Sequence, residues 1–408
     1  MTIIVMKFGG STLTTPEELT QVVAHVKRMQ EAGHQLVIVP SSIKSMRDHI
    51  VKAATAITNI PAKRELDVIY ASATSVSSAL MSIALQDAGI DAIQLTGWQA
   101  GIETDSTHRV ARISNVNPKK VTQYLAEKKV VVVAGYQGID EHGDITTLGD
   151  GGTETVAVAL AVALQAARVE LYSQVDGVYT ADPLVVPNAA KIDELSYEAM
   201  LELAQLGARI IHPRAVELAK QFKMPLIVRS LAQDATGTLL KEEKNVEQAL
   251  LVQGIAYESD VIRLTVGYEE SSETSLATIF KVLAEHGINV DLIVQSLLNG
   301  INPTVSFSIA KEQFAECLEV LEQSKASLGF TFADFEVGLA KISVAGSGMM
   351  LNPGVAARIF DRLRKEDITV KMVSTSEIKV SVIIPQDDMV RAANALHDEF
   401  NLVGSVRV

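Results

Sequence analysis

Short apolar runs alternate along the first 240 residues with stretches in which apolar residues recur every three or four positions. Such runs are typical of buried strands and such stretches of amphipathic helices. The first run covers residues 3–8, and a helix is predicted to begin at Pro16, where Thr15 and Glu18 have capping-box spacing. The other predictions are an end to this helix at Gly33, strands at 36–39, 130–134 and 169–173, and an alanine-rich helix at 153–167. This alternation favours an α/β class, with a parallel or mixed sheet and helices on both faces.

Beyond residue 240 the chain repeats itself. The charged run at 241–244 is interpreted as part of a linker. After it, Ile279 recurs as Ile359 and Ile288 recurs as Ile368, each at an offset of 80 residues. A fixed offset indicates duplication of one unit, which is predicted to have the ferredoxin-like order β-α-β-β-α-β. The predicted division of the chain is 1–240, a linker at 241–250, and two repeats at 251–336 and 337–408.

Composition and charge exclude several classes of protein. The 408 residues include 36 Lys and Arg against 49 Asp and Glu, and the net charge of −13 argues against nucleic acid or an anionic membrane as the main partner. The single cysteine, Cys317, cannot form an internal disulfide, which favours a reducing compartment. The longest apolar run, 156–164, is shorter than the ~20 residues of a membrane span. We therefore expect a cytoplasmic globular protein that binds neither membrane nor nucleic acid.

Two glycine-rich turns are candidate phosphate-binding loops. The first, Lys7 to Ser11, lies at the carboxyl end of a predicted strand, and the second, Gly149 to Glu154, opens the alanine-rich helix. Glycine lets backbone N–H groups approach phosphate oxygens, lysine neutralises phosphate charge, and a helix N-terminus attracts anions. Neither turn has the Walker or the dinucleotide-binding pattern, and glycine turns between strand and helix are common without a ligand.

Two further segments have a chemical and a structural interpretation. Asp176 and Asp182 could hold Mg²⁺ or a ribose, but an Asp-Gly turn and a proline-stopped loop explain them as well. The segment His212-Pro213-Arg214 is equally well explained as the start of a helix. The eight histidines and the lone cysteine lack zinc-site spacing, so no metal site is predicted.

Taken in order, the motifs of the chain resemble those of aspartate kinases over its whole length. The segments that carry the resemblance are 7–11, Leu95 to Gly101, Val133 to Gly138, Val175 to Pro183, Gly207 to Ala215 and Ser374 to Lys379. The resemblance implies an amino-acid-kinase three-layer sandwich followed by two ferredoxin-like ACT domains. It also implies transfer of the ATP γ-phosphoryl group, as Mg-ATP, to the β-carboxylate of L-aspartate in lysine, threonine and methionine synthesis. No permanent cofactor is implied.

The resemblance also assigns roles to individual residues. It implies Lys7 as the catalytic residue. The implied nucleotide-binding residues are Gly9, Gly10, Ser11, Ser173, Gln174, Asp176, Tyr179, Arg229 and Ser230. The implied substrate-binding positions are Met46, Thr74, Asp150, Gly151, Gly152, Thr153 and Glu154. The implied effector-binding residues are Asn289, Asp291, Gln295, Thr375, Ser376 and Glu377.

The chain departs from the family pattern mainly at the substrate-binding positions. Relatives carry a threonine where this chain has Met46, a glutamate where it has Thr74, and a carboxylate-binding arginine where it has Asp150. Losing such an arginine contact costs on the order of 2–5 kcal/mol. The other departures are Glu154 for an aspartate, Ser173-Gln174 for Thr-Asp and Leu184 for an arginine.

Three hypotheses follow. The first is an aspartate kinase with impaired or altered catalysis. The second is an inactive, amino-acid-sensing regulatory subunit, a pseudoenzyme that pairs with an active paralogue. The third is a kinase for a different small molecule, in which Asp150 and Glu154 face a cationic group. All three include an amino-acid effector and a homodimer or higher oligomer formed through the ACT domains.

Overall fold

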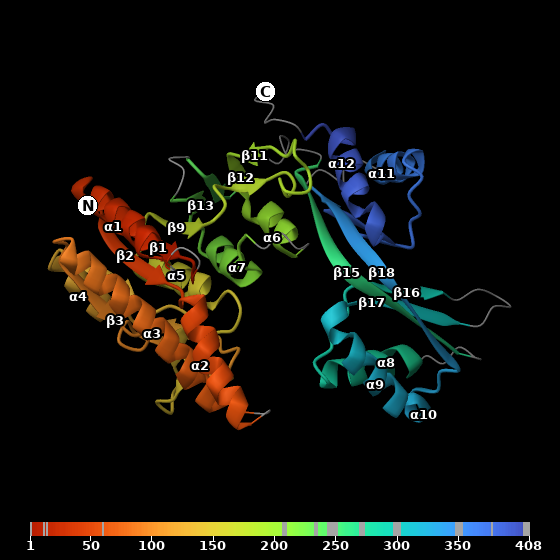
Figure 1. Cartoon of the computed structure of the whole chain (residues 1–408), viewed down its shortest axis with the longest axis horizontal. Helices are drawn as coiled ribbons and strands as arrows, with labels where there is room; N and C mark the ends of the chain where they lie inside the picture. The colour runs from red at the N-terminus through yellow and green to blue at the C-terminus, as the bar shows by residue number, and fades with distance from the viewer. Residues whose placement is uncertain are drawn as a thin grey trace.

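The computed structural model describes residues 2–10, 13, 15–58, 61–205, 210–231, 236–242, 252–268, 274–296, 303–346, 354–376 and 378–402. We call the described residues up to 242 the N-terminal unit and those from 252 the C-terminal unit. In Figure 1 the N-terminal unit is coloured red to green and the C-terminal unit is coloured green to blue, and the two lie side by side.

The N-terminal unit is built on an eight-stranded sheet in the order β12-β14-β13-β9-β1-β2-β6-β3. All neighbouring strands are parallel except β13 and β14. The strands are β1 (Ile3–Phe8), β2 (Gln35–Pro40), β3 (Ala92–Leu95), β6 (Val130–Val133), β9 (Arg168–Ser173), β12 (Glu194–Ser196), β13 (Leu226–Ser230) and β14 (Thr238–Lys241). Smaller sheets join β4 (Ile102–Thr104), β5 (Ile113–Val116), β7 (Gln137–Ile139) and β8 (Ile145–Thr147), and β10 (Val178–Tyr179) with β11 (Lys191–Ile192).

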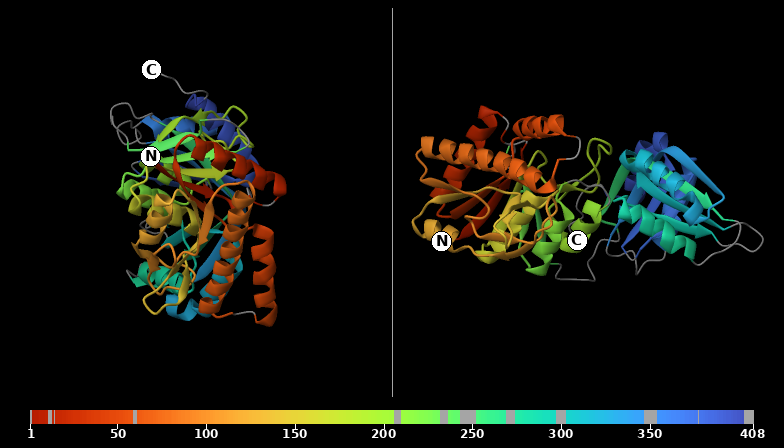
Figure 2. Two further views of the ribbon diagram at one scale, coloured as in Figure 1. Left: turned by 90° about the vertical axis from the view of Figure 1, so that its left-hand side faces the viewer. Right: turned by 90° about the horizontal axis from the view of Figure 1, so that it is seen from below.

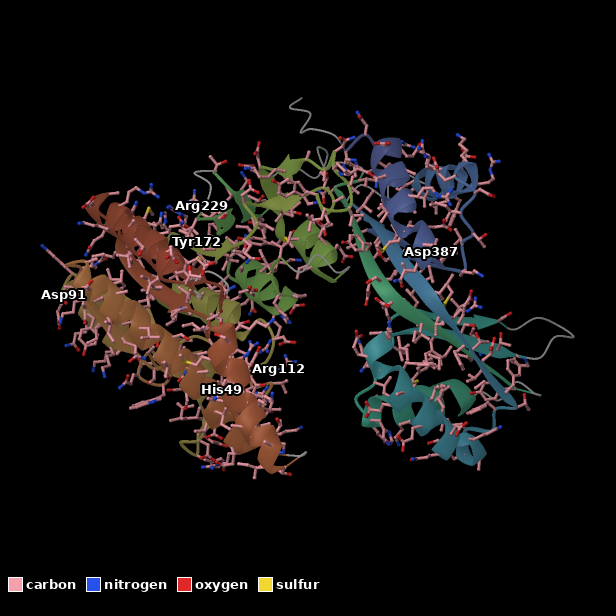
Figure 3. The ribbon with its side chains drawn as sticks, in the orientation of Figure 1. His49, Asp91, Arg112, Tyr172, Arg229 and Asp387 are labelled. Atoms are coloured by element: carbon pink, nitrogen blue, oxygen red, sulfur yellow. The ribbon has the colours of Figure 1, made fainter. Side chains whose placement is uncertain are left out.

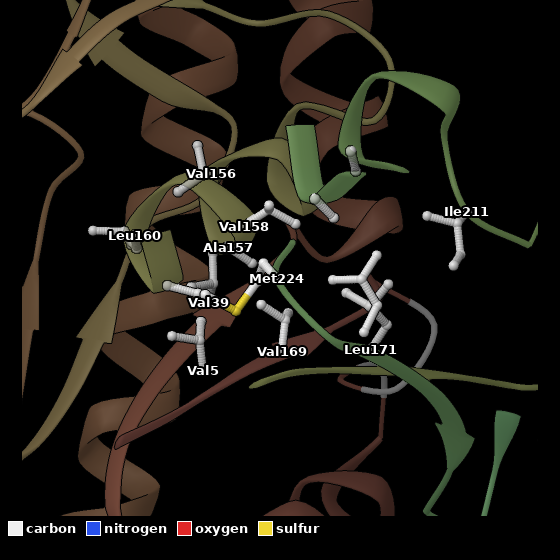
Figure 4. Close-up of a cluster of buried hydrophobic side chains, with 14 of the residues drawn as sticks. Val5, Val39, Val156, Ala157, Val158, Leu160, Val169, Leu171, Ile211 and Met224 are labelled. Atoms are coloured by element: carbon white, nitrogen blue, oxygen red, sulfur yellow. The ribbon is translucent and has the colours of Figure 1, made fainter. Parts of the chain in front are cut away.

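Helices cover both faces of the large sheet, because side chains alternate between the faces along each strand. On β1, Ile4 and Met6 pack with α1 (Pro16–Glu31) and α3 (Lys63–Asp87), whereas Val5 packs with the helices of the opposite face. Those helices are α4 (Lys119–Ala126), α5 (Gly152–Ala163), α6 (Tyr197–Gln205) and α7 (Pro213–Gln221). Figure 4 shows Val5 and Val39 of the sheet among the side chains of α5. The predicted three-layer sandwich is confirmed.

The helix boundaries follow from local capping. The predicted capping box of Thr15 and Glu18 is present, and it begins α1 at Pro16. The alanine-rich helix, however, covers 152–163 rather than 153–167. It ends early because Gln165 has a positive φ of 51° and the N–H of Ala166 bonds the carbonyl of Ala161, as in a Schellman motif.

Helix α3 is the one helix of the described residues that is long and apolar enough to cross a membrane by length and composition. Its buried positions include Ala71, Thr74, Ser78, Met81 and Leu85, which recur every three or four residues. Such a stripe is typical of a helix that packs on a sheet. Helix α2 (Lys44–Ile57) packs on α3 and has no buried residue.

The C-terminal unit is one six-stranded antiparallel sheet in the order β16-β17-β15-β18-β20-β19. Its strands are β15 (Gly254–Gly267), β16 (Ile293–Ser296), β17 (Thr304–Ala310), β18 (Phe332–Ala345), β19 (Met372–Thr375) and β20 (Lys379–Pro385). Its helices are α8 (Thr274–Glu285), α9 (Phe314–Gln323), α10 (Lys325–Leu328), α11 (Gly354–Lys365) and α12 (Met389–Glu399), with single turns η3 (Lys311–Gln313) and η4 (Gln386–Asp388). Figures 1 and 2 show α8–α10 and α11–α12 at different ends of the long strands.

The two repeats share their long strands. Ile255, early in β15, packs in the core under α11 and α12, whereas Ile262 and Leu264, later in β15, pack with α8 and α9. Strand β18 likewise follows α9 of the first repeat and precedes α11 of the second. The first repeat has the predicted order β-α-β-β-α-β when β18 is counted as its last strand. The same strand is also the first strand of the second repeat. The predicted linker begins inside β14, and most of it lies outside the described residues.

Candidate functional site

A cavity of about 820 Å³ opens at the carboxyl ends of β1 and β2, where open α/β sheets bind their ligands. Helix α2 contributes Lys44 and Arg47, helix α3 contributes Tyr70 and Thr74, and the second glycine turn contributes Asp150 to Glu154. The cavity is therefore bounded by one of the two predicted glycine loops and by Gly10 of the other.

Lys7 and Glu154 link these two loops. The Nζ of Lys7 lies 3.0 Å from Oε1 of Glu154, and the two side chains are only 12% and 13% exposed. The other carboxylate oxygen of Glu154 accepts the backbone N–H of His212 at 2.8 Å. Glu154 thus holds the side chain of Lys7, the residue that the resemblance implies as catalytic. Glu154 is itself one of the departures from the family pattern.

Two glycines are required by close packing at this site. A Cβ on Gly10 would lie 2.4 Å from the carbonyl oxygen of Ser42, so only glycine fits there. Gly151 caps α5 with a φ of +68°, and a Cβ there would lie 2.2 Å from the side chain of His212. Gly152 and Thr153, at the N-terminus of α5, line the cavity.

Two predicted substrate positions differ from expectation. Met46, on α2, is not among the residues that line the cavity, whereas its neighbours Lys44 and Arg47 are. Thr74 lines the cavity but is only 2% exposed. Its hydroxyl donates to the carbonyl of Ala71 and accepts from Nε2 of Gln137 at 2.7 Å, so its hydrogen bonds are made within the protein.

A cluster around Asp67 contributes two side chains, Tyr70 and Arg109, to the cavity wall. We call Asp67, Tyr70, His108, Arg109 and Thr147 the Asp67 cluster. The fully buried carboxylate of Asp67 accepts from Nδ1 of His108 at 2.7 Å, from the hydroxyl of Thr147 and from the backbone N–H of Arg109. The guanidinium of Arg109 lies 3.8 Å above the ring of Tyr70 and lines the cavity.

Tyr136 and Asp150 lie beside this cluster. The ring of Tyr136 lies 6.0 Å from the ring of Tyr70. Burial raises the pKa of Tyr136, the charge of Asp150 raises it further, and the charge of Arg109 opposes both. Asp150 is itself exposed at the mouth of the cavity.

The predicted nucleotide-binding residues gather at the same edge of the sheet. Ser173 and Ser230 end the neighbouring parallel strands β9 and β13 and are register partners. Gly9 follows the adjacent strand β1 and donates its N–H to the carbonyl of Tyr172 at 3.3 Å. Gln174 is exposed beyond β9, and Ser11 lies outside the described residues.

Arg229, also predicted to bind nucleotide, takes part in a buried network. We call His25, Arg168, Glu170, Tyr172 and Arg229 the Glu170 cluster, and Figure 3 shows Tyr172 and Arg229 near each other. Glu170 is fully buried and accepts from Arg229 at 3.2 Å, from Arg168 at 2.7 Å and from the hydroxyl of Tyr172 at 2.5 Å. Burial would raise the pKa of Glu170, but these partners hold it below its ordinary value.

The loop after β9 is tied to the C-terminal unit. Asp176 accepts from the hydroxyl of Tyr179 at 2.8 Å and pairs with Lys191 at 3.4 Å. Asp182 accepts the N–H of Leu184 and the hydroxyl of Tyr257, each at 2.9 Å. The carboxylate of Asp182 therefore anchors the loop against β15, and the interpretation as a proline-stopped loop fits it better than a cation site.

The contacts between the loop and the second repeat are extensive. The hydroxyl of Thr180 lies 3.0 Å from Nε2 of His397 on α12, and Ala181 and Val186 belong to the core under α11 and α12. Burial lowers the pKa of His397. The loop that carries Asp176 and Tyr179 is therefore in direct contact with the second repeat.

The predicted effector residues divide into two groups. Gln295 lies on β16 and Thr375 on β19, the two opposite edges of the six-stranded sheet, so one chain does not bring them together. Asp291, near β16, pairs with the buried Lys341 at 2.5 Å. Asn289 donates its backbone N–H to Gln313, Ser376 bonds Lys379 through its backbone, and Glu377 lies outside the described residues.

The residues that the sequence did not reveal lie chiefly in α3 and in the loop before β5. Tyr70 and Arg109 belong to no motif and become neighbours only through folding, because the contact joins residues far apart in sequence. Arg109 has a positive φ of 76°, but backbone strain leaves no clear signal in a single sequence.

Comparison with known proteins gives the family. Residues 2–230 match the model of the amino acid kinase family, and residues 342–400 match an ACT domain model. An aspartokinase of Bacillus sp. (strain MGA3) is 46% identical over 405 residues, which is 99% of this chain and 98% of that protein. An aspartokinase of Geobacillus stearothermophilus is 47% identical over 402 residues, 98% of each chain.

Solved structures agree on the fold. The structure of E. coli aspartokinase III in complex with aspartate and ADP matches with a TM-score of 0.80, at 22% identity, over 97% of this chain and 99% of that one. Aspartate kinase from Synechocystis is 36% identical, with a TM-score of 0.55, over 100% of this chain and 70% of that one. The chain therefore belongs to the aspartokinase family of amino acid kinases.

Proposed function

We propose that this protein transfers the γ-phosphoryl group of ATP to the β-carboxylate of L-aspartate, using an acceptor site that differs from the family pattern. The carrying observation is the ion pair of Lys7 with Glu154, which links the two glycine loops and places Glu154 in the wall of the cavity. The function of relatives that are 46–47% identical over nearly the whole chain supports the same reaction. A cytoplasmic location and a role in lysine, threonine and methionine synthesis are part of this proposal.

The geometry suits phosphoryl transfer, which requires positioning and charge neutralisation rather than a covalent intermediate. Lys7 brings a positive charge to the carboxyl end of β1, and Glu154 fixes its position. The N-terminus of α5 directs backbone N–H groups and the positive end of the helix dipole toward the cavity. These groups stabilise the charge that develops on the transferred phosphoryl group.

Mg²⁺ enters this proposal with the nucleotide. Among the described residues, no three His, Cys, Asp or Glu side chains gather as a metal site. In kinases Mg²⁺ is bound through substrate phosphates, water and one or two carboxylates. When bound, the ion neutralises phosphate charge.

The test is ATP turnover by the purified chain with L-aspartate, with hydroxylamine to trap the acyl phosphate. We expect turnover in the unmodified chain and a loss of about 10³-fold in kcat for Lys7→Ala, because a preorganised charge is removed. Lys27→Ala, which removes an exposed lysine of α1, is the matched control and should keep full activity.

Each alternative predicts a different result. An amino-acid-sensing subunit would bind an amino acid without turnover, and it would regain activity only with a paralogue. A kinase for another small molecule would bind Mg-ATP but phosphorylate a different acceptor, for which the exposed Asp150 offers a partner to a cationic group. Absence of turnover with L-aspartate in a folded, ATP-binding chain would overturn the proposed function.

We further propose a homodimer formed through the first repeat, with an amino-acid effector bound near the shared edge. Ile293 and Val294 of the edge strand β16 are 51% and 40% exposed, and Phe335 and Val337 of β18 are exposed as well. An apolar edge strand favours pairing with a second sheet. Sedimentation of Ile293→Lys should show a shift toward monomer, and an unchanged mass would contradict this interface.

A further inference from the structure

Arg109 brings an arginine charge to the cavity, and its ion pair with Asp67 is a long one. Its guanidinium lies 3.7 Å from Asp67, and its side chain is 24% exposed. It also contacts the ring of Tyr70, at 3.8 Å, the hydroxyl of Thr147, at 3.2 Å, and the hydroxyl of Tyr136. A guanidinium has five N–H donors in a planar fork, so these neutral neighbours leave donors for a carboxylate in the cavity.

The backbone of Arg109 is conformationally strained. Its φ of 76° is in the left-handed region, which a long side chain rarely adopts. Tyr136, which lines the same cavity, also has a positive φ, of 72°. The strain at Arg109 persists because Asp67 accepts its backbone N–H at 3.2 Å with both carboxylate oxygens. Such strained residues cluster at ligand-binding sites.

The turn of Arg109 lies directly beside the turn of Asp150. A Cβ on Gly149 would lie 2.9 Å from the carbonyl oxygen of Arg109, and the N–H of Ala111 bonds the carbonyl of Thr147 at 2.9 Å. Arg214 joins the two turns by donating to the carbonyls of Leu148 and Ala111. A guanidinium from the first turn therefore reaches the cavity wall next to the side chain at position 150.

We infer that Arg109 binds the α-carboxylate of the amino-acid acceptor and thereby supplies the positive charge that position 150 lacks in this chain. The inference rests on the proposed function. Asp67 acts as a positioning residue, since it holds the backbone of the arginine. The aromatic ring of Tyr70 fixes the plane of the guanidinium, and the exposed side of the fork faces the acceptor.

The test compares Arg109→Gly, Arg109→Lys and Arg112→Ala by steady-state kinetics and by calorimetric titration with L-aspartate. Glycine tolerates the positive φ at position 109, so this variant should fold at least as well as the natural chain. Arg112→Ala removes the same charge three residues away at an exposed position, and it controls for long-range electrostatics.

For Arg109→Gly we expect the Kd and KM for L-aspartate to rise by about 30-fold or more, with the KM for ATP changed less than about threefold. For Arg109→Lys we expect a Kd and a KM for L-aspartate between those of the unmodified chain and those of Arg109→Gly, because lysine keeps the charge but lacks the planar fork of donors. Adding Asp150→Arg to Arg109→Gly should restore most of the affinity.

The outcomes separate this inference from the proposed function. An unmodified chain that turns over L-aspartate, with an Arg109→Gly variant of unchanged aspartate affinity, would overturn the inference and leave the function standing. A chain that binds L-aspartate without turnover and loses binding in Arg109→Gly would support the inference and overturn the function. A chain that neither binds nor phosphorylates L-aspartate would overturn both.

Discussion

The Asp67 cluster and the Glu170 cluster contain the same types of group but hold their arginines differently. In each, a fully buried carboxylate lies beside a tyrosine and an arginine, and the arginines are almost equally exposed, at 24% for Arg109 and 23% for Arg229. Glu170 contacts Arg229 directly at 3.2 Å, whereas Asp67 lies 3.7 Å from the guanidinium of Arg109.

The difference arises from the other partners of each carboxylate. The oxygens of Asp67 are occupied by His108, Thr147 and a backbone N–H, so the guanidinium of Arg109 is turned toward the cavity. Those of Glu170 are occupied by Tyr172 and two arginines, so Arg229 is part of the structure. The partners that satisfy a buried carboxylate thus decide whether a neighbouring arginine is structural or is available to a ligand.

The largest expected effect is that of Glu170→Ala. Because it leaves two arginines beside a buried space without their carboxylate, we expect the free energy of unfolding to fall by about 3–5 kcal/mol. Urea denaturation measures it. The control is Glu198→Ala, which removes the solvent-screened pair with Lys220 and should cost at most about 1 kcal/mol. Similar losses in the two variants would contradict a structural role for the Glu170 cluster.

The next effect is that of Thr74→Glu, which adds the carboxylate expected from the family pattern. Position 74 is 2% exposed and its hydrogen bonds are satisfied, so we expect a loss of about 3 kcal/mol in the free energy of unfolding. Thr74→Ser keeps the hydroxyl and should lose less than about 1 kcal/mol. A glutamate variant as stable as the serine variant would contradict this prediction. It would indicate that the guanidinium of Arg109 stabilises a carboxylate at position 74.

A smaller effect comes from the backbone beside the Asp67 cluster. Gly151→Ala places a methyl group against His212 at a positive φ, and we expect a loss of about 2–3 kcal/mol with a lower kcat. Gly143→Ala also has a positive φ, of 82°, but no atom within 4 Å of the new Cβ. It should therefore show only the conformational cost of about 1 kcal/mol, and the difference between the two melting curves measures the contact with His212.

The smallest effect is a pH dependence of the Glu170 cluster. The native pKa of Glu170 lies below its ordinary value of 4.5, so its stabilisation is complete above that pH and is lost as the pH falls through the native pKa. The difference in unfolding free energy between the natural chain and Glu170→Gln should therefore shrink as the pH falls below 4.5. A difference that stays constant from pH 7 to pH 3 would contradict this assignment.

Much of the fold could be predicted because its signals are local. The capping box at Thr15 and the 3–8 strand have fixed spacings, and the structure has both. The end of the alanine-rich helix was predicted too late, because residues 163–167, which are Ala-Leu-Gln-Ala-Ala, carry no signal for the left-handed conformation of Gln165. The sharing of β15 between two cores was not predicted either, since a repeat in sequence does not show which core each half of a strand joins.

The sequence by itself determined the family, the two glycine loops and the lysine at the end of β1, because each depends on residues that are close together in the chain. Only the tertiary structure decided that the hydroxyl of Thr74 bonds Gln137, that Arg229 is bound to Glu170, and that Arg109 faces the cavity. These properties depend on which distant group satisfies each buried carboxylate or hydroxyl, and folding alone brings those groups together.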